Sequence, residues 1–119
     1  WAGSPVSAEE DTVKPFIVKV HADWCGTCTQ LEPTFEALDA KYRDSARLVV
    51  FDVTDRQSLE KSRAEADRLG LRAFFEANKF KTGIIAVIDG RTRETVAIFG
   101  GETDARAYDA AIASALGDA

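Results

Sequence analysis

Residues 16–28 read Phe-Ile-Val-Lys-Val-His-Ala-Asp-Trp-Cys-Gly-Thr-Cys and join an apolar run to two closely spaced cysteines. The run at 16–22 is short, rich in β-branched residues and preceded by Pro15. These features predict a buried strand. The cysteine pair, Cys25 and Cys28, follows this strand directly.

A helix is predicted over residues 27–42, because its apolar residues recur at steps of four, three and four along one face. These residues are Leu31, Phe35, Leu38 and Tyr42. Pro33 falls inside the helix and should kink it, since proline lacks the N–H donor and clashes with the preceding turn. The cysteine pair is therefore expected at a helix N-terminus.

Apolar periodicity and turn residues predict the remaining elements. They are a strand at 47–53, a helix at 57–69 ended by Gly70, a short helix at 71–78, and a β-hairpin at 84–88 and 95–99. Thr103 is expected to cap a last helix whose apolar stripe is Ala105, Tyr108, Ile112 and Leu116. This order of elements predicts an α/β fold with helices on both faces of a mixed sheet.

Length and charge exclude several classes of protein. At 119 residues the chain fits one compact domain, since two separate cores would each be very small. A net charge of -5, from 20 acidic and 15 basic residues, would repel a phosphate backbone, so nucleic acid is not expected as a partner. No apolar run approaches the roughly 20 residues of a membrane-spanning helix, so no membrane insertion of this chain is expected.

The two cysteines suit exchange chemistry better than structural cross-linking, because a disulfide between them closes only a tiny loop. A helix N-terminus stabilises a thiolate, which favours Cys25 as the nucleophile. Cys28 lies one turn inward and can resolve a mixed disulfide on Cys25. Gly26 should permit close approach of the backbone, and the hydroxyl of Thr27 could hydrogen-bond a thiolate.

The cysteine pair has two other interpretations. The same spacing occurs in half of a zinc site, but zinc takes four ligands and only His21 remains as an imidazole, so no metal ligands are assigned. Alternatively, the cysteines could act as buried small apolar residues. The strand, the tryptophan and the helix start that converge on them argue against this second interpretation.

The segment 22–28, with the apolar strand before it and the Pro33 helix after it, resembles the active-site segment of the thioredoxin superfamily. The usual family pattern is W-C-G-P-C, and this chain differs from it only at Thr27, which replaces proline. The resemblance extends loosely over residues 16–116. It implies a thioredoxin-like three-layer α/β/α fold with a central mixed sheet.

The resemblance also implies roles for individual residues. In the family the first cysteine is the exposed nucleophile and the second is the buried resolver, which carries over to Cys25 and Cys28. The tryptophan beside the nucleophile helps to form the substrate-binding surface and corresponds to Trp24; Gly26 and Thr27 belong to the same candidate surface. The implied function is thiol-disulfide exchange with protein substrates and a redox partner protein, in either direction, with no cofactor beyond the cysteine pair.

One departure from the family lies on the strand. Thioredoxins usually have a buried acid six positions before the nucleophile, and this chain has Lys19 there. A charged Lys19 near the sulfurs should stabilise a thiolate and make the disulfide more oxidising. The alternative is that its long stem carries the amine to the surface.

A second departure concerns the family's cis-proline before the last hairpin, whose position is taken by Thr82. A cis bond before a residue other than proline costs about 3 kcal/mol, so the Lys81–Thr82 bond is either trans with altered docking or strained. Thr82 is nevertheless a candidate substrate-binding residue. A third departure is the long connection at 56–81, whose large apolar residues either pack in the core or line a partner groove: Leu71, Phe74, Phe75 and Phe80.

Residues 1–15 are expected to be an N-terminal extension, and residues 16–119 the thioredoxin-like domain. The absence of Met and the start at Trp1 are interpreted as loss of an export signal, which favours an extracytoplasmic or periplasmic location; truncation of a cytoplasmic protein is the alternative. A monomer is expected. The competing functions are a redox-sensitive binding or adaptor domain with little turnover, and metal or cluster binding between two chains.

Overall fold

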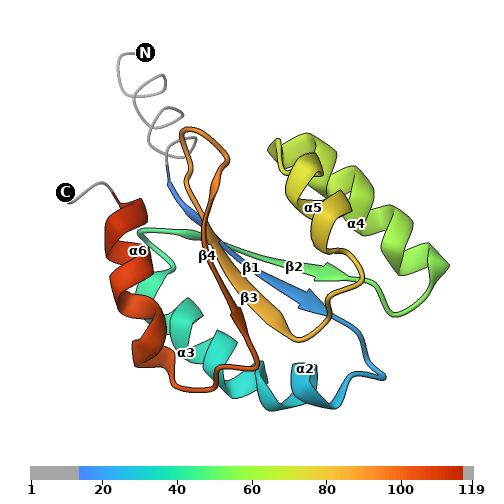
Figure 1. The fold of residues 1–119 in the computed structure, drawn as a ribbon, viewed down its shortest axis with the longest axis horizontal. Helices are drawn as coiled ribbons and strands as arrows, with labels where there is room; N and C mark the ends of the chain where they lie inside the picture. Colours follow the sequence, from blue (N-terminus) through green and yellow to red (C-terminus); the bar gives the residue numbers. More distant parts are fainter. Residues whose placement is uncertain (1–13, 117–119) are drawn as a thin grey trace.

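The computed structural model describes residues 14–116. Its elements are the strands β1 (Phe16–His21), β2 (Arg47–Asp52), β3 (Ile84–Ile88) and β4 (Thr95–Gly100), the α-helices α2 (Gly26–Gln30), α3 (Glu32–Tyr42), α4 (Arg56–Leu69), α5 (Arg72–Asn78) and α6 (Asp109–Ala115), and the 3-10 helix η1 (Ala105–Tyr108). The predicted order of strands and helices is confirmed (Figure 1). The expected N-terminal extension falls almost entirely outside the described residues.

The four strands form one mixed sheet in the order β2-β1-β3-β4. β1 pairs with β2 in parallel and with β3 antiparallel, and β3 pairs with β4 as the predicted hairpin. β1 and β3 are therefore central strands. Both faces of each strand are covered, which explains why their residues are mostly apolar, with Lys19 of β1 as a buried charged exception.

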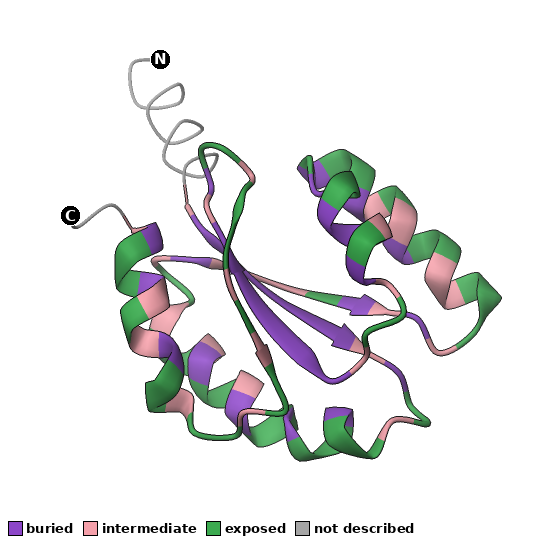
Figure 2. Cartoon of the chain, viewed as in Figure 1, coloured by how far each residue is buried: buried purple, intermediate pink, exposed green. Residues whose placement is uncertain are grey.

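Helices cover both faces of the sheet, so the three-layer α/β/α architecture is confirmed (Figure 1). On one face the even-numbered β1 residues pack against α4 and α5 in a cluster that includes Phe16, Val18, Val20, Phe74 and Phe75. On the other face Ile17 packs against α3, η1 and α6, together with Leu38, Tyr108 and Ile112. Figure 2 shows the resulting band of buried residues through the central strands.

The predicted helix over 27–42 is divided at Leu31, which ends α2 and begins α3. Pro33 lies in the first turn of α3, where its missing N–H and its fixed backbone angle are tolerated. The expected kink is thus a complete break between two helices. As a result, the cysteine pair belongs to a separate helical turn.

The caps of the later helices follow local sequence rules. Asp55 accepts the N–H of Ser58 at the start of α4, and Gly70, at φ +77°, ends this helix in the predicted left-handed conformation. The expected cap at Thr103 is wrong: the carboxylate of Asp104 accepts the N–H of Arg106 and begins η1. A carboxylate one residue later makes the same kind of cap, and of the predicted apolar stripe Tyr108 and Ile112 are buried while Ala105 and Leu116 are partly buried.

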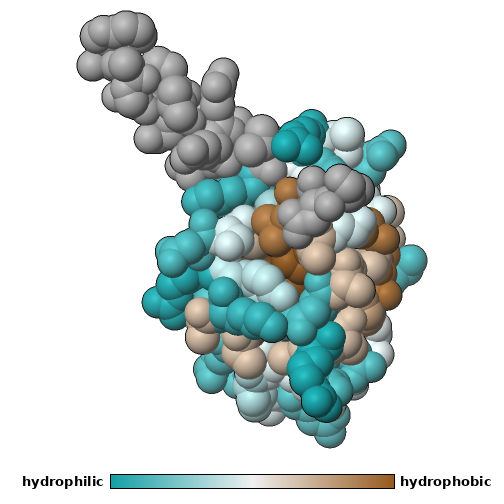
Figure 3. Space-filling view, turned by 90° about the vertical axis from the view of Figure 1, so that its left-hand side faces the viewer, coloured by the Kyte–Doolittle hydropathy of each residue, from teal (hydrophilic) through white to brown (hydrophobic). Residues whose placement is uncertain are grey.

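The outer surface is largely hydrophilic, with apolar residues exposed near the sheet edges. Figure 3 shows one such apolar area among hydrophilic residues. Val96 and Ile98 on the edge strand β4 and Val50 on the edge strand β2 are among the exposed residues. Among residues 14–116, no helix has the length and apolar character needed to cross a membrane.

Candidate active site

The cysteine pair lies where β1 ends and α2 begins. Cys25 is the N-cap of α2, and its sulfur accepts the backbone N–H of Cys28 at 3.2 Å. Cys25 is partly exposed, whereas Cys28 is fully buried one turn further on. Both are free thiols. One sulfur is therefore accessible from solution, and the second lies beneath it.

The site stabilises a thiolate at Cys25. Burial acts to raise the pKa of Cys25, but hydrogen bonds from the Cys28 thiol, the Thr82 hydroxyl and the backbone N–H groups of Cys28 and Thr27 outweigh it. Together these donors lower the pKa of Cys25 below the ordinary value of a thiol. The accessible sulfur is thus also the better nucleophile.

Cys28 behaves in the opposite way. Burial raises the pKa of Cys28, and its hydrogen bond to the Cys25 sulfur raises it further, while the positive charge of Lys19 acts to lower it. The Cys28 thiol lies 3.6 Å from the carbonyl oxygen of Val20 on β1. Cys28 thus retains its proton while Cys25 ionises.

Trp24 is held beside the cysteines by a contact between distant segments. Its indole N–H donates to the carbonyl of Thr54 at 2.9 Å, and the hydroxyl of Thr54 accepts the backbone N–H of Asp23. Thr54 is itself fixed by Asp52, whose carboxylate accepts both the N–H and the hydroxyl of Thr54. Trp24 nevertheless remains 66% exposed. The side chain is anchored and still available to a partner.

The segment before β3 brings Thr82 to the cysteine pair. Its hydroxyl is a hydrogen-bond partner of Cys25. The Lys81–Thr82 bond is trans, as are all the peptide bonds of residues 14–116. Of the two alternatives left open by the sequence, the trans bond is therefore the one present.

Gly83 is a site residue that the sequence alone did not indicate. Its φ is +83°, and a Cβ at this position would lie 2.9 Å from the Thr27 methyl group and 3.5 Å from the Cys25 sulfur. The N–H of Gly83 donates to Val20, and its carbonyl accepts the N–H of Gly101. The sequence signal that could have indicated it is a glycine directly between Thr82 and the start of β3.

The structure changes the roles that the sequence predicts for Gly26 and Thr27. A Cβ at Gly26 would meet no atom within 4 Å, so the close approach expected there occurs at Gly83 instead. Thr27 contributes its backbone N–H to Cys25, and its methyl group packs against Gly83. Among the described residues, Thr82 rather than Thr27 supplies the hydroxyl.

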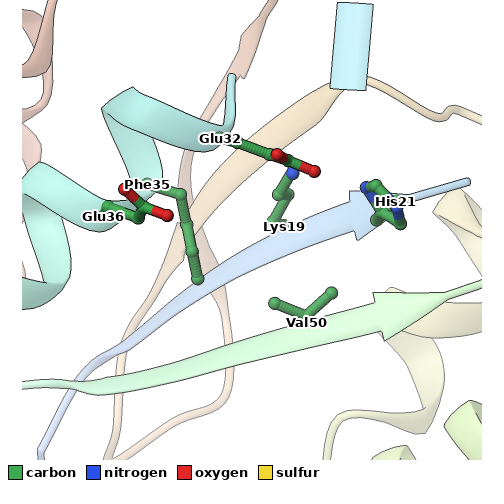
Figure 4. Close-up of a pocket in the computed structure, with 6 residues that line it drawn as sticks. All are labelled: Lys19, His21, Glu32, Phe35, Glu36 and Val50. Carbon is green, nitrogen blue, oxygen red and sulfur yellow. The ribbon is translucent and has the colours of Figure 1, made fainter. Parts of the chain in front are cut away.

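Lys19 is buried, with 3% of its surface exposed. It lines a hollow of about 250 Å³ between β1, β2 and α3, together with His21, Glu32, Phe35, Glu36 and Val50. Figure 4 shows its side chain directed toward the carboxylate of Glu32. Lys19 thus points into the hollow between β1, β2 and α3. Its stem does not carry the side chain out to the surface.

The long connection at 56–81 is mostly structural. Leu71, Phe74 and Phe75 are buried in the cluster beneath α4 and α5, as core packing predicts. Phe80 departs from this pattern, because 79% of its surface is exposed two residues before Thr82. This aromatic side chain is therefore accessible to a partner.

Comparison with known proteins agrees with the fold and the cysteine pair. The thioredoxin family model matches residues 6–67, just over half of the chain. The chain belongs to the thioredoxin family. This match includes the Cys25–Cys28 pair, which has the C-x-x-C spacing.

Relatives of this thioredoxin-family chain align mainly over short segments. Thioredoxin H8 of Arabidopsis thaliana is 46% identical over 41 residues, which cover 34% of this chain and 28% of that protein. Thioredoxin of Borreliella burgdorferi is 37% identical over 46 residues, 39% of each chain. Protein disulfide isomerase-like 1-4 of Oryza sativa is 33% identical over 69 residues, 58% of this chain and 12% of that one. The matches thus span well under two thirds of these relatives.

Solved structures support the same fold over most of the chain. A thiol:disulfide interchange protein of Chlorobium tepidum has a TM-score of 0.59 at 20% identity, covering 92% of this chain and 84% of its own. Thioredoxin of Fasciola hepatica has a TM-score of 0.56 at 18% identity, covering 95% and 91%. At these identities the likeness establishes the thioredoxin fold.

Proposed function

We propose that this protein exchanges its Cys25–Cys28 dithiol and disulfide with thiols and disulfides of protein substrates. The observation that carries the proposal is the asymmetry of the pair. Cys25 is accessible and has a lowered pKa, whereas Cys28 is buried and has a raised pKa. A nucleophile and a resolving thiol need this division of properties.

The reaction proceeds in two exchanges. In the reducing direction, the Cys25 thiolate attacks a substrate disulfide, forms a mixed disulfide and releases one substrate thiolate. Cys28 then loses its proton and attacks the Cys25 sulfur, which forms the Cys25–Cys28 bond and releases the second substrate thiolate. Two electrons pass to the substrate, and the released thiolates take up protons from water or from the pair.

The surroundings of Cys25 support docking of a polypeptide. Trp24 is anchored and exposed, and Thr82 and Gly83 lie beside the Cys25 sulfur. A substrate chain that lies between these segments would present its disulfide to Cys25. The thioredoxin and protein disulfide isomerase names of the relatives agree with protein disulfides as the substrate class.

Turnover of a protein disulfide tests this function. Reduction of insulin by a dithiol should be accelerated by the protein and abolished in Cys25→Ser. Gln30→Ala is a matched control, since Gln30 is exposed on the same short helix and should leave the rate unchanged. If no exchange with any protein disulfide or small dithiol occurs, the proposal is wrong.

A second candidate is a binding or adaptor domain with little turnover. The observation in its favour is the exposure of two large aromatic residues, Trp24 beside Cys25 in the chain and Phe80 two residues before Thr82. A domain of this kind should still bind its partner after both cysteines are replaced by serine. Loss of binding in that double variant would favour the exchange function.

A further inference from the structure

Lys19 is buried on β1, the strand that precedes the cysteine pair, and an ammonium group loses hydration when it is buried. Lys19 faces the α3 side of the sheet at the centre of β1. Among residues 14–116, no side chain forms a hydrogen bond or an ion pair with its amine, which keeps some contact with solvent, since His21 Nδ1 is the buried side-chain polar atom without a partner in this part of the chain. The cation is therefore not neutralised by a fixed partner in the described part of the chain.

Few charged groups face this amine. From α3 come the carboxylates of Glu32 and Glu36, which lie at the rim of the same hollow (Figure 4). From β1 comes His21, whose Nε2 is bonded to Asp23 and whose buried Nδ1 has no partner among the described residues. β2 contributes Val50 to the hollow, and Asp52, which pairs with His21, follows two residues later on the same face of β2. The carboxylates of Glu32 and Glu36 line the hollow together with Lys19 and oppose its positive charge.

The charge of Lys19 also acts on the resolving thiol of α2, where it lowers the pKa of Cys28 against the larger effect of burial. The Cys28 thiol contacts the carbonyl of Val20, the residue that follows Lys19 on β1. Both residues are buried, Cys28 fully and Lys19 with 3% of its surface exposed. Charges interact more strongly in such surroundings than at an exposed surface.

We propose that Lys19 is a positioning residue for the resolving step, and that its ammonium group stabilises the thiolate of Cys28. The proposal rests on the exchange function above. When Cys28 attacks the mixed disulfide, it must give up a proton although burial opposes its negative charge. Lys19 offsets this cost by charge attraction. The Cys28 proton leaves to water or to the departing substrate thiolate, the Cys25–Cys28 bond forms, and the bond from Cys25 to the substrate breaks.

The first test measures the pKa of Cys28 without requiring turnover. In a Cys25→Ser background, Cys28 is titrated by the chemical shift of its Cβ in Lys19→Met, in Glu32→Gln and in the exposed control Lys61→Met. We expect Lys19→Met to raise the pKa by about half to one unit. Glu32→Gln should lower it, since a charge that opposes Lys19 is removed. Lys61→Met should leave it unchanged.

The second test measures the resolving step itself. A mixed disulfide between Cys25 and glutathione should decay about threefold to tenfold more slowly in Lys19→Met than in the parent near neutral pH, the factor that follows from the expected pKa shift. The slowing should diminish at high pH, where Cys28 ionises without help. A purely structural role for Lys19 would slow decay equally at every pH.

The two proposals fail in different ways. If the parent protein resolves mixed disulfides but Lys19→Met changes neither the pKa of Cys28 nor the decay rate, the inference on Lys19 is wrong and the exchange function stands. Shifts in the same direction for Lys19→Met and Glu32→Gln would also overturn it. If the parent forms no mixed disulfide, the exchange function fails, while the titration still measures the field of Lys19.

Discussion

The hydroxyl of Thr82 hydrogen-bonds the sulfur of Cys25, which joins the segment before β3 to the first residue of the cysteine helix. This contact links two parts of the chain that are far apart in sequence. It also supplies a side-chain donor at the point where a thiolate must form. The ionisation of Cys25 thus depends on the fold as well as on its own helix.

Thr82→Val is expected to raise the pKa of Cys25. A hydrogen bond to a charged group contributes about 1.5–3 kcal/mol in buried surroundings, but Cys25 is partly exposed, so we expect only about half to one pKa unit. The pH dependence of alkylation by iodoacetamide measures this shift. Thr95→Val, at an exposed position on β4, is the matched control. An unchanged pKa in Thr82→Val would show that the hydroxyl does not act on the thiolate.

Gly83→Ala is expected to be markedly more disruptive than Gly26→Ala. At Gly83 the added Cβ combines a φ of +83° with a 2.9 Å approach to the Thr27 methyl group, whereas at Gly26 it meets no atom within 4 Å. The positive φ alone should cost about 1–2 kcal/mol of unfolding free energy. Urea unfolding of the two variants checks the difference.

The source of this cost can be separated by a second substitution. Thr27→Ser removes the methyl group that the new Cβ would meet but leaves the backbone angle of Gly83 unchanged. The double variant of Gly83→Ala and Thr27→Ser should therefore recover part of the lost stability. Equal stabilities of Gly83→Ala and Gly26→Ala would contradict the geometry of this segment.

The pKa shifts of the two cysteines predict how the stability of the reduced protein depends on pH. Between the lowered pKa of folded Cys25 and the ordinary thiol value of about 8.5, the unfolded state binds more protons, so stability rises with pH. Above that value the raised pKa of Cys28 reverses the sign, because the folded state then binds more protons. The contribution of the pair should therefore be largest near about pH 8.5.

This pH dependence is measured as a difference. Urea unfolding of the reduced protein is compared with that of the Cys25→Ser, Cys28→Ser double variant at each pH, so that other titrating groups cancel. A maximum in the difference supports both shifts. A difference that is independent of pH would mean that neither thiol is perturbed by folding.

Trp24→Ala should impair exchange with proteins more than exchange with small thiols. The indole is 66% exposed, so its removal should cost little stability, while a docking polypeptide loses an anchored aromatic surface. We expect the rate of insulin reduction to fall about tenfold or more, with little change in exchange with dithiothreitol. Val96→Ala, exposed on the edge strand β4, serves as control. Equal losses with both substrates would assign Trp24 to the chemistry of the pair.

The sequence predicts those elements whose own residues favour the conformation and the burial that the folded chain gives them. The apolar residues of β1 and β3 lie in central strands, Gly70 takes the left-handed cap, and Pro33 interrupts the helix. The last cap is predicted one residue too early because Thr103 and Asp104 are neighbours that can both cap a helix, and aspartate is the stronger cap.

The parts of the site that the sequence did not predict depend on contacts between distant segments. The role of Gly83 depends on its approach to Thr27, which only the packed sheet and helix reveal. Likewise, Thr54 carries no sequence signal for its part in holding Trp24. The burial of Lys19 was left open because a long cationic side chain either stays inside or reaches the surface, and the strand pattern does not distinguish these outcomes.

Trapping of the mixed disulfide tests most directly whether Cys25 attacks and Cys28 resolves. Cys28→Ser incubated with an oxidised protein substrate should accumulate a covalent complex through Cys25, visible by non-reducing electrophoresis and by intact mass. Cys25→Ser should form none, because Cys28 is buried. We expect a complex with Cys28→Ser and none with Cys25→Ser. A complex that forms through Cys28, or none with either variant, would contradict it.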